Sequence, residues 1–277
     1  MTAAFDLDAY LQRIGYTGDR RPTLDTLRGL HLAHALTIPF ENLNPLLHWP
    51  VRLDAASLQR KLVRDGRGGY CFEQNSLFML ALRAMGFSVR GLTGRVLWGL
   101  PPNTVNARTH MVLLIDIDGA RYMADVGFGS QRLTGPLRLE TDIEQPTPHE
   151  PSRLIDADDG FTLQSLVQGE WRPLYWFDLG KQLEIDYEVA NWYTSAHPVS
   201  HFMMNLIVAR QAPGRRYALN NHELIVHHLD GPSERRTLGT IAELRDVMAH
   251  TFGLTLPDTP ELDVRLAFVL AKQAGTA

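Results

Sequence analysis

Cysteine is almost absent from this chain, because Cys71 is the only one among its 277 residues. A single cysteine excludes an internal disulfide, which fits a protein of the reducing cytoplasm. A lone thiol is usually a small packed side chain, but it becomes reactive where its surroundings favour the thiolate. The sequence around Cys71 therefore decides how this residue is interpreted.

Long apolar runs are absent as well. No stretch approaches the roughly 18 consecutive apolar residues of a membrane-spanning helix. The opening residues, MTAAFDLDAYLQRIGYTG, lack the basic start and the apolar core of a secretory signal. We therefore expect a cytoplasmic protein with no membrane partner.

Lysine is also scarce, since Lys61, Lys181 and Lys272 are the only lysines among 27 basic residues, and the net charge is −4. The basic residues are scattered, whereas a nucleic-acid surface needs a basic stripe that matches the phosphates. A glycine-rich phosphate-binding loop is not present either. These absences argue against a nucleic-acid partner, and any ligand that carries phosphates must be held in another way.

The secondary-structure signals divide the chain into three regions, which predict an α+β fold. Helical spacing of apolar residues predicts four helices in the first region, near 5–15, 23–36, 55–64 and 71–86. The second region alternates β-branched and aromatic runs with turn signals, which predicts an antiparallel meander curled into a small barrel, and a short helical or irregular stretch near 186–198 follows it. The third region predicts strands near 202–210, 216–219, 223–229 and 234–239, then helices at 240–253 and 260–273.

Cys71 lies within RGGYCFEQN, at the predicted start of the fourth helix. A helix N-terminus favours an anion because its first N–H groups are unpaired and the dipole is positive there, so it promotes the thiolate. Gly68 and Gly69 permit a tight entry turn just before it. A catalytic thiol still needs an imidazole as its base, and the imidazole needs a carboxylate that orients it.

The segment HMVLLIDIDGARYMADV can supply both groups. A two-residue turn at 118–119 would pair Ile117 with Ala120, because Asp-Gly is a strong hairpin signal. In that register His110 and Asp125 become diagonal neighbours on the same face of the hairpin. A turn of another length would separate them. Spacing alone therefore predicts a Cys–His–Asp site, while a packed cysteine remains an open alternative.

Other ionisable residues have simpler interpretations. Two carboxylates crowd the hairpin turn and should face solvent: Asp116 and Asp118. His31 and His34 lie on a predicted helix with no partner motif, and we interpret them as packing or surface residues. The remaining histidines show no spacing that requires a metal, since His227 and His228 point to opposite faces of a strand. We expect no metal site.

Six motifs follow one another along the chain: IPFENL (38–43), RGGYCFEQN (67–75), GRVLWG (94–99), RTHMVLL (108–114), ADVGFGS (124–130) and PLYWFDLG (173–180). With these motifs in this order the chain resembles the arylamine N-acetyltransferases, and it looks most like the bacterial members. The resemblance covers most of the chain and is weakest in the last third.

This resemblance implies a helical bundle over 1–86, a β-barrel over 87–195 and an α/β lid over 196–277, arranged around a cysteine-protease-like catalytic core. It implies Cys71 as the nucleophile, His110 as its base and Asp125 as the group that orients the imidazole. The implied reaction is ping-pong. Acetyl-CoA acetylates the cysteine, CoA leaves, and an arylamine, arylhydrazine or N-hydroxyarylamine takes the acetyl group.

The resemblance also implies binding residues and partners. The implied acceptor pocket is formed by five residues: Phe40, Tyr70, Val96, Thr109 and Phe128. Gly127 and Gly129 would let their loop approach the acyl group and the thiol arm of CoA, and Glu41 with Arg67 would form a buried structural pair. The implied partners are acetyl-CoA, as acetyl donor, and small aromatic acceptors, for a monomer or homodimer without a metal.

Two other functions use the same residues. A cysteine hydrolase, such as an amidase or peptidase, could employ the same triad with water as the acceptor. A non-enzymatic protein could instead pack Cys71 and bind a ligand passively. A requirement for acetyl-CoA and an amine would distinguish transfer from hydrolysis, and rapid alkylation of Cys71 at pH 6 would argue against a packed thiol.

Overall fold

The computed structural model describes residues 5–101 and 104–272. Its helices are α1 (Leu7–Ile14), α2 (Leu24–Thr37), α3 (Leu43–Leu46), α4 (Ala55–Leu58), α5 (Cys71–Ala84), α6 (Glu184–Ala196), α7 (Ile241–Asp246) and α8 (Pro260–Ala271). Its strands are β1 (Phe40–Glu41), β2 (Ser88–Val96), β3 (His110–Ile117), β4 (Ala120–Ala124), β5 (Leu137–Arg138), β6 (Ser152–Ala157), β7 (Gly160–Val167), β8 (Glu170–Phe177), β9 (Ile207–Ala212), β10 (Arg215–Asn220), β11 (Glu223–His228) and β12 (Glu234–Thr237).

The helices begin and end at local signals in the sequence. Asp6 caps α1 by accepting a hydrogen bond from the Ala9 N–H, and Gly15 ends the helix in the left-handed conformation. The Thr240 side chain caps α7 by accepting from the Glu243 N–H, as the capping box predicts. None of the helices within 5–101 and 104–272 is long and apolar enough to cross a membrane.

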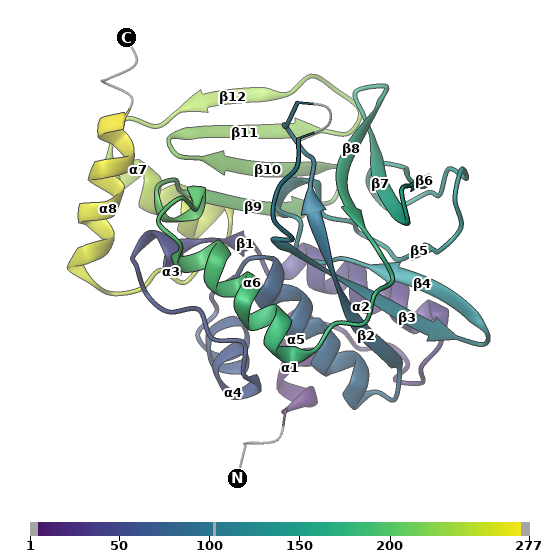
Figure 1. Ribbon diagram of the computed structural model, residues 1–277. Coiled ribbons are helices and arrows are strands. Elements are labelled where there is room, and N and C mark those ends of the chain that lie inside the picture. Colours follow the sequence, from purple (N-terminus) through teal and green to yellow (C-terminus); the bar gives the residue numbers. More distant parts are fainter. Residues whose placement is uncertain (1–4, 102–103, 273–277) are drawn as a thin grey trace.

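Seven strands form the antiparallel barrel, in the order β5-β4-β3-β2-β8-β7-β6. Isolated bridges from Thr141 to Leu154 and from Gln145 to Ser152 connect the chain after β5 to β6, so the sheet is nearly closed. Figure 1 shows the barrel on the right, beside the helices of the N-terminal region. The barrel prediction is confirmed.

The β3–β4 hairpin has the predicted register. Ile117 pairs with Ala120, and residues 118 and 119 take positive φ angles of 50° and 79° in the two-residue turn. The ladder ends where Leu113 pairs with Ala124. Asp125 is therefore the first residue beyond the strand, and its backbone is free to bond elsewhere.

The second sheet has the order β1-β9-β10-β11-β12 and lies across the top of the molecule in Figure 1. Its edge strand β1 comes from the IPFENL segment, where Phe40 pairs with Ala209 of β9. The N-terminal helical region and the C-terminal sheet are thus joined by backbone hydrogen bonds. The short pairing was not expected from the sequence, because a two-residue strand has no periodicity.

The predicted strand at 202–210 begins later than expected. A 3₁₀ turn occupies His201–Met203, because the Ser200 side chain accepts a hydrogen bond from the Phe202 N–H and caps the turn. The strand starts at Ile207. In the same part of the chain, the stretch near 186–198 is a regular helix, α6, which packs Tyr187 into the core formed by α1, α2, α5 and β3.

Candidate active site

Cys71 is the first residue of α5, and its side chain is 5% exposed. The Glu73 carboxylate accepts a hydrogen bond from the Tyr70 N–H at 3.2 Å, which fixes the first turn of the helix. The thiol Sγ lies 3.5 Å from the Thr109 carbonyl oxygen, one residue before His110. The helix start therefore presents the thiol to the barrel strand that carries the histidine.

The RGG segment before Cys71 packs its backbone closely against the backbone of residues 39–40. A Cβ on Gly68 would lie 2.1 Å from the Pro39 carbonyl oxygen, so no side chain fits there. The neighbouring Gly69 bridges to Phe40 of β1. The Gln74 side chain closes the arrangement by donating hydrogen bonds to the Pro39 and Gly69 carbonyl oxygens, at 2.8 and 3.1 Å. The start of α5 is thus tied to β1.

His110 and Asp125 form a buried pair. The imidazole Nε2 lies 2.7 Å from the carboxylate Oδ2, which leaves Nδ1 as the ring nitrogen available to the thiol. Burial lowers the pKa of His110, but the charge and hydrogen bond of Asp125, with smaller contributions from Cys71, outweigh burial and raise it well above the ordinary value. Burial raises the pKa of Asp125, but His110 and two further donors outweigh burial and lower it. The pair therefore favours an imidazolium beside a carboxylate.

The Asp125 carboxylate and the backbone around it are held on every side. Its Oδ1 accepts hydrogen bonds from Asn75 Nδ2 at 2.9 Å and from the Gly127 N–H at 2.8 Å. Asn75 also accepts from the Val126 N–H at 3.1 Å. The Asp125 N–H donates to His31 Nε2 at 3.2 Å. Asp125 can therefore orient His110 with little freedom of its own.

Asn75 and His31 are positioning residues that sequence reasoning missed. Asn75 lies one turn beyond Cys71 in the RGGYCFEQN motif, and that spacing was the available signal. His31 was interpreted as a packing or surface residue, and it is buried against Phe78 while it also bonds the catalytic loop. No local pattern reveals that second contact.

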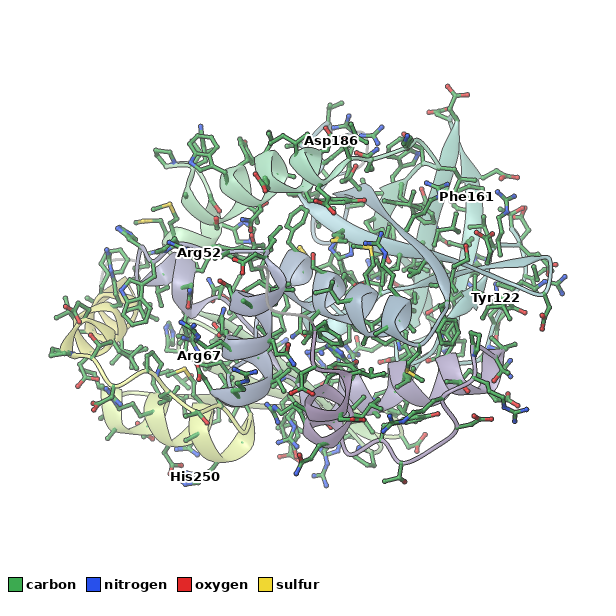
Figure 2. The ribbon with its side chains drawn as sticks, turned by 90° about the horizontal axis from the view of Figure 1, so that it is seen from below. Arg52, Arg67, Tyr122, Phe161, Asp186 and His250 are labelled. Carbon is green, nitrogen blue, oxygen red and sulfur yellow. The ribbon has the colours of Figure 1, made fainter. Side chains whose placement is uncertain are left out.

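A buried charge cluster lies behind the nucleophile. Arg67 Nη2 is 2.8 Å from Glu41 Oε1, and Lys61 Nζ lies 3.4 Å from the same oxygen and 2.7 Å from Glu73 Oε1. Burial raises the pKa of Glu41, but the charges of Arg67 and Lys61 outweigh it and lower that pKa. Figure 2 shows Arg67 between the N-terminal helices and the C-terminal ones. The structure contains the Arg67–Glu41 pair, and Lys61 extends it to the helix that carries Cys71.

A single cavity reaches both the thiol and the imidazole. Six of the seven predicted pocket and loop residues line this cavity: Phe40, Val96, Thr109, Gly127, Phe128 and Gly129. The Phe128 ring centroid lies 4.9 Å from that of His110, in an edge-on arrangement. Phe202, which was not predicted, also lines the cavity and packs edge-on against Phe40. The surroundings of the thiol are thus apolar and aromatic.

Tyr70 does not line this cavity. Its side chain is fully buried, its ring packs against Phe72 and Phe202, and its hydroxyl donates to the Asn191 side chain of α6. Tyr70 is the N-cap of α5 and has an extended backbone. The Tyr70 hydroxyl thus joins the start of α5 to α6.

The outer part of the cavity carries charge. Two of its arginines are already paired, Arg172 with Glu170 and Arg216 with Glu150, each at 2.5 Å. Arg235 is held only loosely, 4.0 Å from Glu223. It is therefore the cation of this wall that is most available to an anionic ligand. Over 5–101 and 104–272, no group of three or more His, Cys, Asp or Glu residues could hold a metal ion.

The sequence and the fold both have known relatives. A family model described as N-acetyltransferase matches residues 23–261. The arylamine N-acetyltransferase of Mycolicibacterium smegmatis is 45% identical over 273 residues, which cover 96% of this chain and 99% of that protein. The arylamine N-acetyltransferase / N-hydroxyarylamine O-acetyltransferase of Salmonella typhimurium is 40% identical over 268 residues, 96% of this chain and 95% of that protein. The structure of the Mycobacterium marinum arylamine N-acetyltransferase in complex with CoA matches with a TM-score of 0.92 and 41% identity, over 95% of this chain and 99% of that one.

Proposed function

The chain belongs to the arylamine N-acetyltransferase family, and from that premise we propose that it transfers the acetyl group of acetyl-CoA to arylamines, arylhydrazines and N-hydroxyarylamines through an acetyl-Cys71 thioester. The observation that carries this proposal is the geometry of the site. A lone thiol lies at a helix N-terminus, next to the His110–Asp125 pair and at the wall of an apolar cavity. Within that pair, His110 Nε2 is 2.7 Å from Asp125 Oδ2.

The first half-reaction acetylates the enzyme. The Cys71 thiolate attacks the thioester carbonyl carbon of acetyl-CoA, and the bond from that carbon to the CoA sulfur breaks. The leaving thiolate takes a proton from the His110 imidazolium and departs as CoA. Because one thiolate replaces another, the exchange is nearly balanced in energy, and positioning of the carbonyl is what the site must provide.

The second half-reaction uses His110 as a base. The uncharged amine nitrogen attacks the acetyl carbonyl carbon, the bond to Cys71 sulfur breaks, and His110 takes the proton that the nitrogen loses. The products are the acetamide and the resting thiolate–imidazolium pair. An arylamine suits this step because its nitrogen is weakly basic and stays uncharged at neutral pH.

The walls of the cavity suit these ligands. Phe40, Val96, Thr109, Phe128 and the unpredicted Phe202 would hold a flat acceptor, since an aromatic ring prefers an apolar slot with few polar groups. A Cβ on Gly127 would lie 2.7 Å from the Cys71 Cα, so this glycine permits close packing against the nucleophile. At Gly129 the same Cβ would meet nothing within 4 Å, and this open space suits the CoA arm. We assign the CoA phosphates to the loosely held Arg235.

The experiment that tests the function separates the two half-reactions. Incubation with acetyl-CoA and no amine should release one CoA per protein and leave one acetyl group, which peptide mass spectrometry should locate at Cys71. Addition of an arylamine should then start steady turnover. Continuous CoA release without any amine would favour the hydrolase alternative, and release only after the amine is added would contradict the ping-pong order.

The thiol also bears on where the enzyme works. A reactive cysteine is oxidised stepwise outside a reducing compartment, so we place this enzyme in the cytoplasm. The wide aromatic slot is compatible with foreign arylamines, and a role in xenobiotic metabolism is part of the proposal.

Replacement of Phe128 with alanine tests the acceptor slot. The ring contacts His110 edge-on and lines the cavity, so its loss should raise KM for aromatic acceptors by about 10-fold or re-rank them. Acetylation of Cys71 by acetyl-CoA should change far less. The measurement is the rate of each half-reaction for wild type and variant with several acceptors. Equal losses in both half-reactions would assign Phe128 to packing instead.

A further inference from the structure

Arg132 is a buried cation that has no carboxylate against it. Its side chain is 3% exposed, and its hydrogen bonds go to backbone carbonyl oxygens alone: Gly129 at 3.4 Å, Ile38 at 2.9 Å, Val126 at 3.2 Å and Ala209 at 3.3 Å. Within 5–101 and 104–272, no carboxylate oxygen lies within 4.0 Å of its guanidinium. Burial lowers the pKa of Arg132 to about 9, and the charge of Asp125 partly offsets that effect. A buried unpaired charge is costly, so its retention needs a reason.

The four carbonyls belong to three segments that meet behind the triad. Val126 and Gly129 lie in the loop after Asp125, Ile38 precedes β1, and Ala209 is in β9. A guanidinium has five N–H donors in a rigid fork, so one side chain can join all three segments. Together with Asn75 and His31, Arg132 completes the set of bonds that fix the backbone around Asp125.

Most of the other titratable groups around this point are neutral or paired. On α2, burial lowers the pKa of His31 to about 4 and that of His34 to about 3, so both are neutral at pH 7. On β10, Arg216 is paired with Glu150. On β9, the Arg210 guanidinium donates to the Leu36 and Thr251 carbonyl oxygens.

The charges that remain are those of Arg210, of Arg132 and of the triad. Tyr175 of β8, which faces His110, keeps its proton because burial raises its pKa. Cys71 on α5 and His110 on β3 exchange one proton between them. Arg132 bonds the carbonyl oxygen of Val126, next to Asp125, and the Asp125 charge raises the pKa of Arg132 against the effect of burial.

We propose that Arg132 is a positioning residue for acetyl transfer, which holds the Asp125 loop in place and balances the Asp125 charge within the buried site. With Arg132 and Asp125 opposed, the site is neutral overall both as thiol–imidazole and as thiolate–imidazolium. Once Cys71 carries the acetyl group the thiolate is gone, and an imidazolium would leave the site with a net positive charge. The charge of Arg132 then favours the neutral imidazole, which is the form that accepts the proton of the amine.

This role of Arg132 rests on the proposed acetyl transfer. The test therefore includes alkylation of Cys71, a measurement that does not require acetyl transfer. R132Q and R132K both shorten the side chain and lose the fork, but only R132Q removes the charge. In R132Q the loss of a positive charge disfavours the thiolate and favours the imidazolium. The pH midpoints of Cys71 alkylation by iodoacetamide, and of deacetylation by an arylamine in a single turnover, should both rise by about one pH unit.

In R132K both midpoints should stay near those of wild type while the deacetylation rate falls about 3- to 10-fold, because the loop is held less firmly. Arg13→Gln is the matched control. Arg13 is a partly buried arginine of α1 that donates to the Leu62 carbonyl oxygen, away from the triad. In this variant the pH midpoints of alkylation and of deacetylation should stay at the wild-type values. R132M replaces R132Q if thermal melting shows that R132Q does not fold.

Unmoved midpoints in the neutral variant, or equal shifts in R132K and R132Q, would overturn the charge role of Arg132. A wild-type protein that alkylates normally but transfers no acetyl group would instead refute the proposed function and leave the alkylation comparison valid.

Discussion

Cys71→Ala should abolish acetyl transfer, with turnover at least about 10⁴-fold below wild type, because loss of a triad nucleophile removes covalent catalysis entirely. The chain has no second cysteine that could replace it. The thiol occupies little space at the start of α5, so the variant should keep its fold. The measurement is CoA release with acetyl-CoA and an arylamine, together with thermal melting of both proteins.

Cys71→Ser is the matched variant, since it keeps the size and the hydrogen-bonding position of the side chain. A hydroxyl keeps its proton beside His110, where a thiol can lose its own, and it is a far weaker nucleophile than a thiolate. It should therefore be almost as inactive as the alanine variant. Turnover by the alanine variant within about 100-fold of wild type would show that another residue carries the acetyl group.

Asp125→Asn should lower the acetyl-transfer rate by about 10²–10⁴-fold, somewhat less than the same change costs in a serine triad, because a thiol needs less activation than a hydroxyl. The amide oxygen would still accept from Asn75 and Gly127, so the amide nitrogen would face His110 Nε2. That nitrogen donates, which forces Nε2 to accept and places the imidazole proton on the nitrogen that should serve as the base.

The pH dependence of this variant follows from the same contact. The Asp125 charge raises the pKa of His110 against the effect of burial, so without the charge burial dominates and that pKa falls. The imidazolium then disappears at lower pH, and less thiolate is present as its partner. We expect Cys71 alkylation at pH 6 to slow markedly, measured as the iodoacetamide rate from pH 5 to 9.

Two matched controls lie on the same hairpin. Asp116 and Asp118 are exposed near the turn, and Asp118 has a φ of 50°, which asparagine also tolerates. Asp116→Asn and Asp118→Asn should leave both the transfer rate and the alkylation profile unchanged. A profile that moved in Asp116→Asn and not in Asp125→Asn would mean that another carboxylate orients His110.

Local signals were sufficient for the parts of the site that lie within one element or one hairpin. The Asp-Gly turn defined the register that brings His110 to Asp125, and the glycines before Cys71 indicated a helix start. The helix caps and the barrel strands could be predicted for the same reason, since each depends on residues a few positions apart.

Contacts between distant segments could not be predicted in this way. Phe40 pairs with Ala209 across 169 positions, and neither residue carries a pattern that identifies the other. The positions of Tyr70, His31 and Arg132 depend on the same kind of contact, since each meets a partner from another part of the fold. The resemblance implied a ligand contact for Tyr70, whereas its ring lies buried against Phe72 and Phe202.

The pairing of β1 with β9 has a consequence for how this protein is made. All three triad residues have left the ribosome long before Ile207 is synthesised, yet β1 cannot pair until β9 exists. Chains of this kind expose unpaired strand edges and apolar surface while they wait for a distant partner segment. A nascent or truncated chain that ends before β9 would hold every catalytic residue and still lack the strand that braces the segment before α5. Completion of the site is therefore a late event in synthesis, although its chemistry is encoded in the first half of the chain.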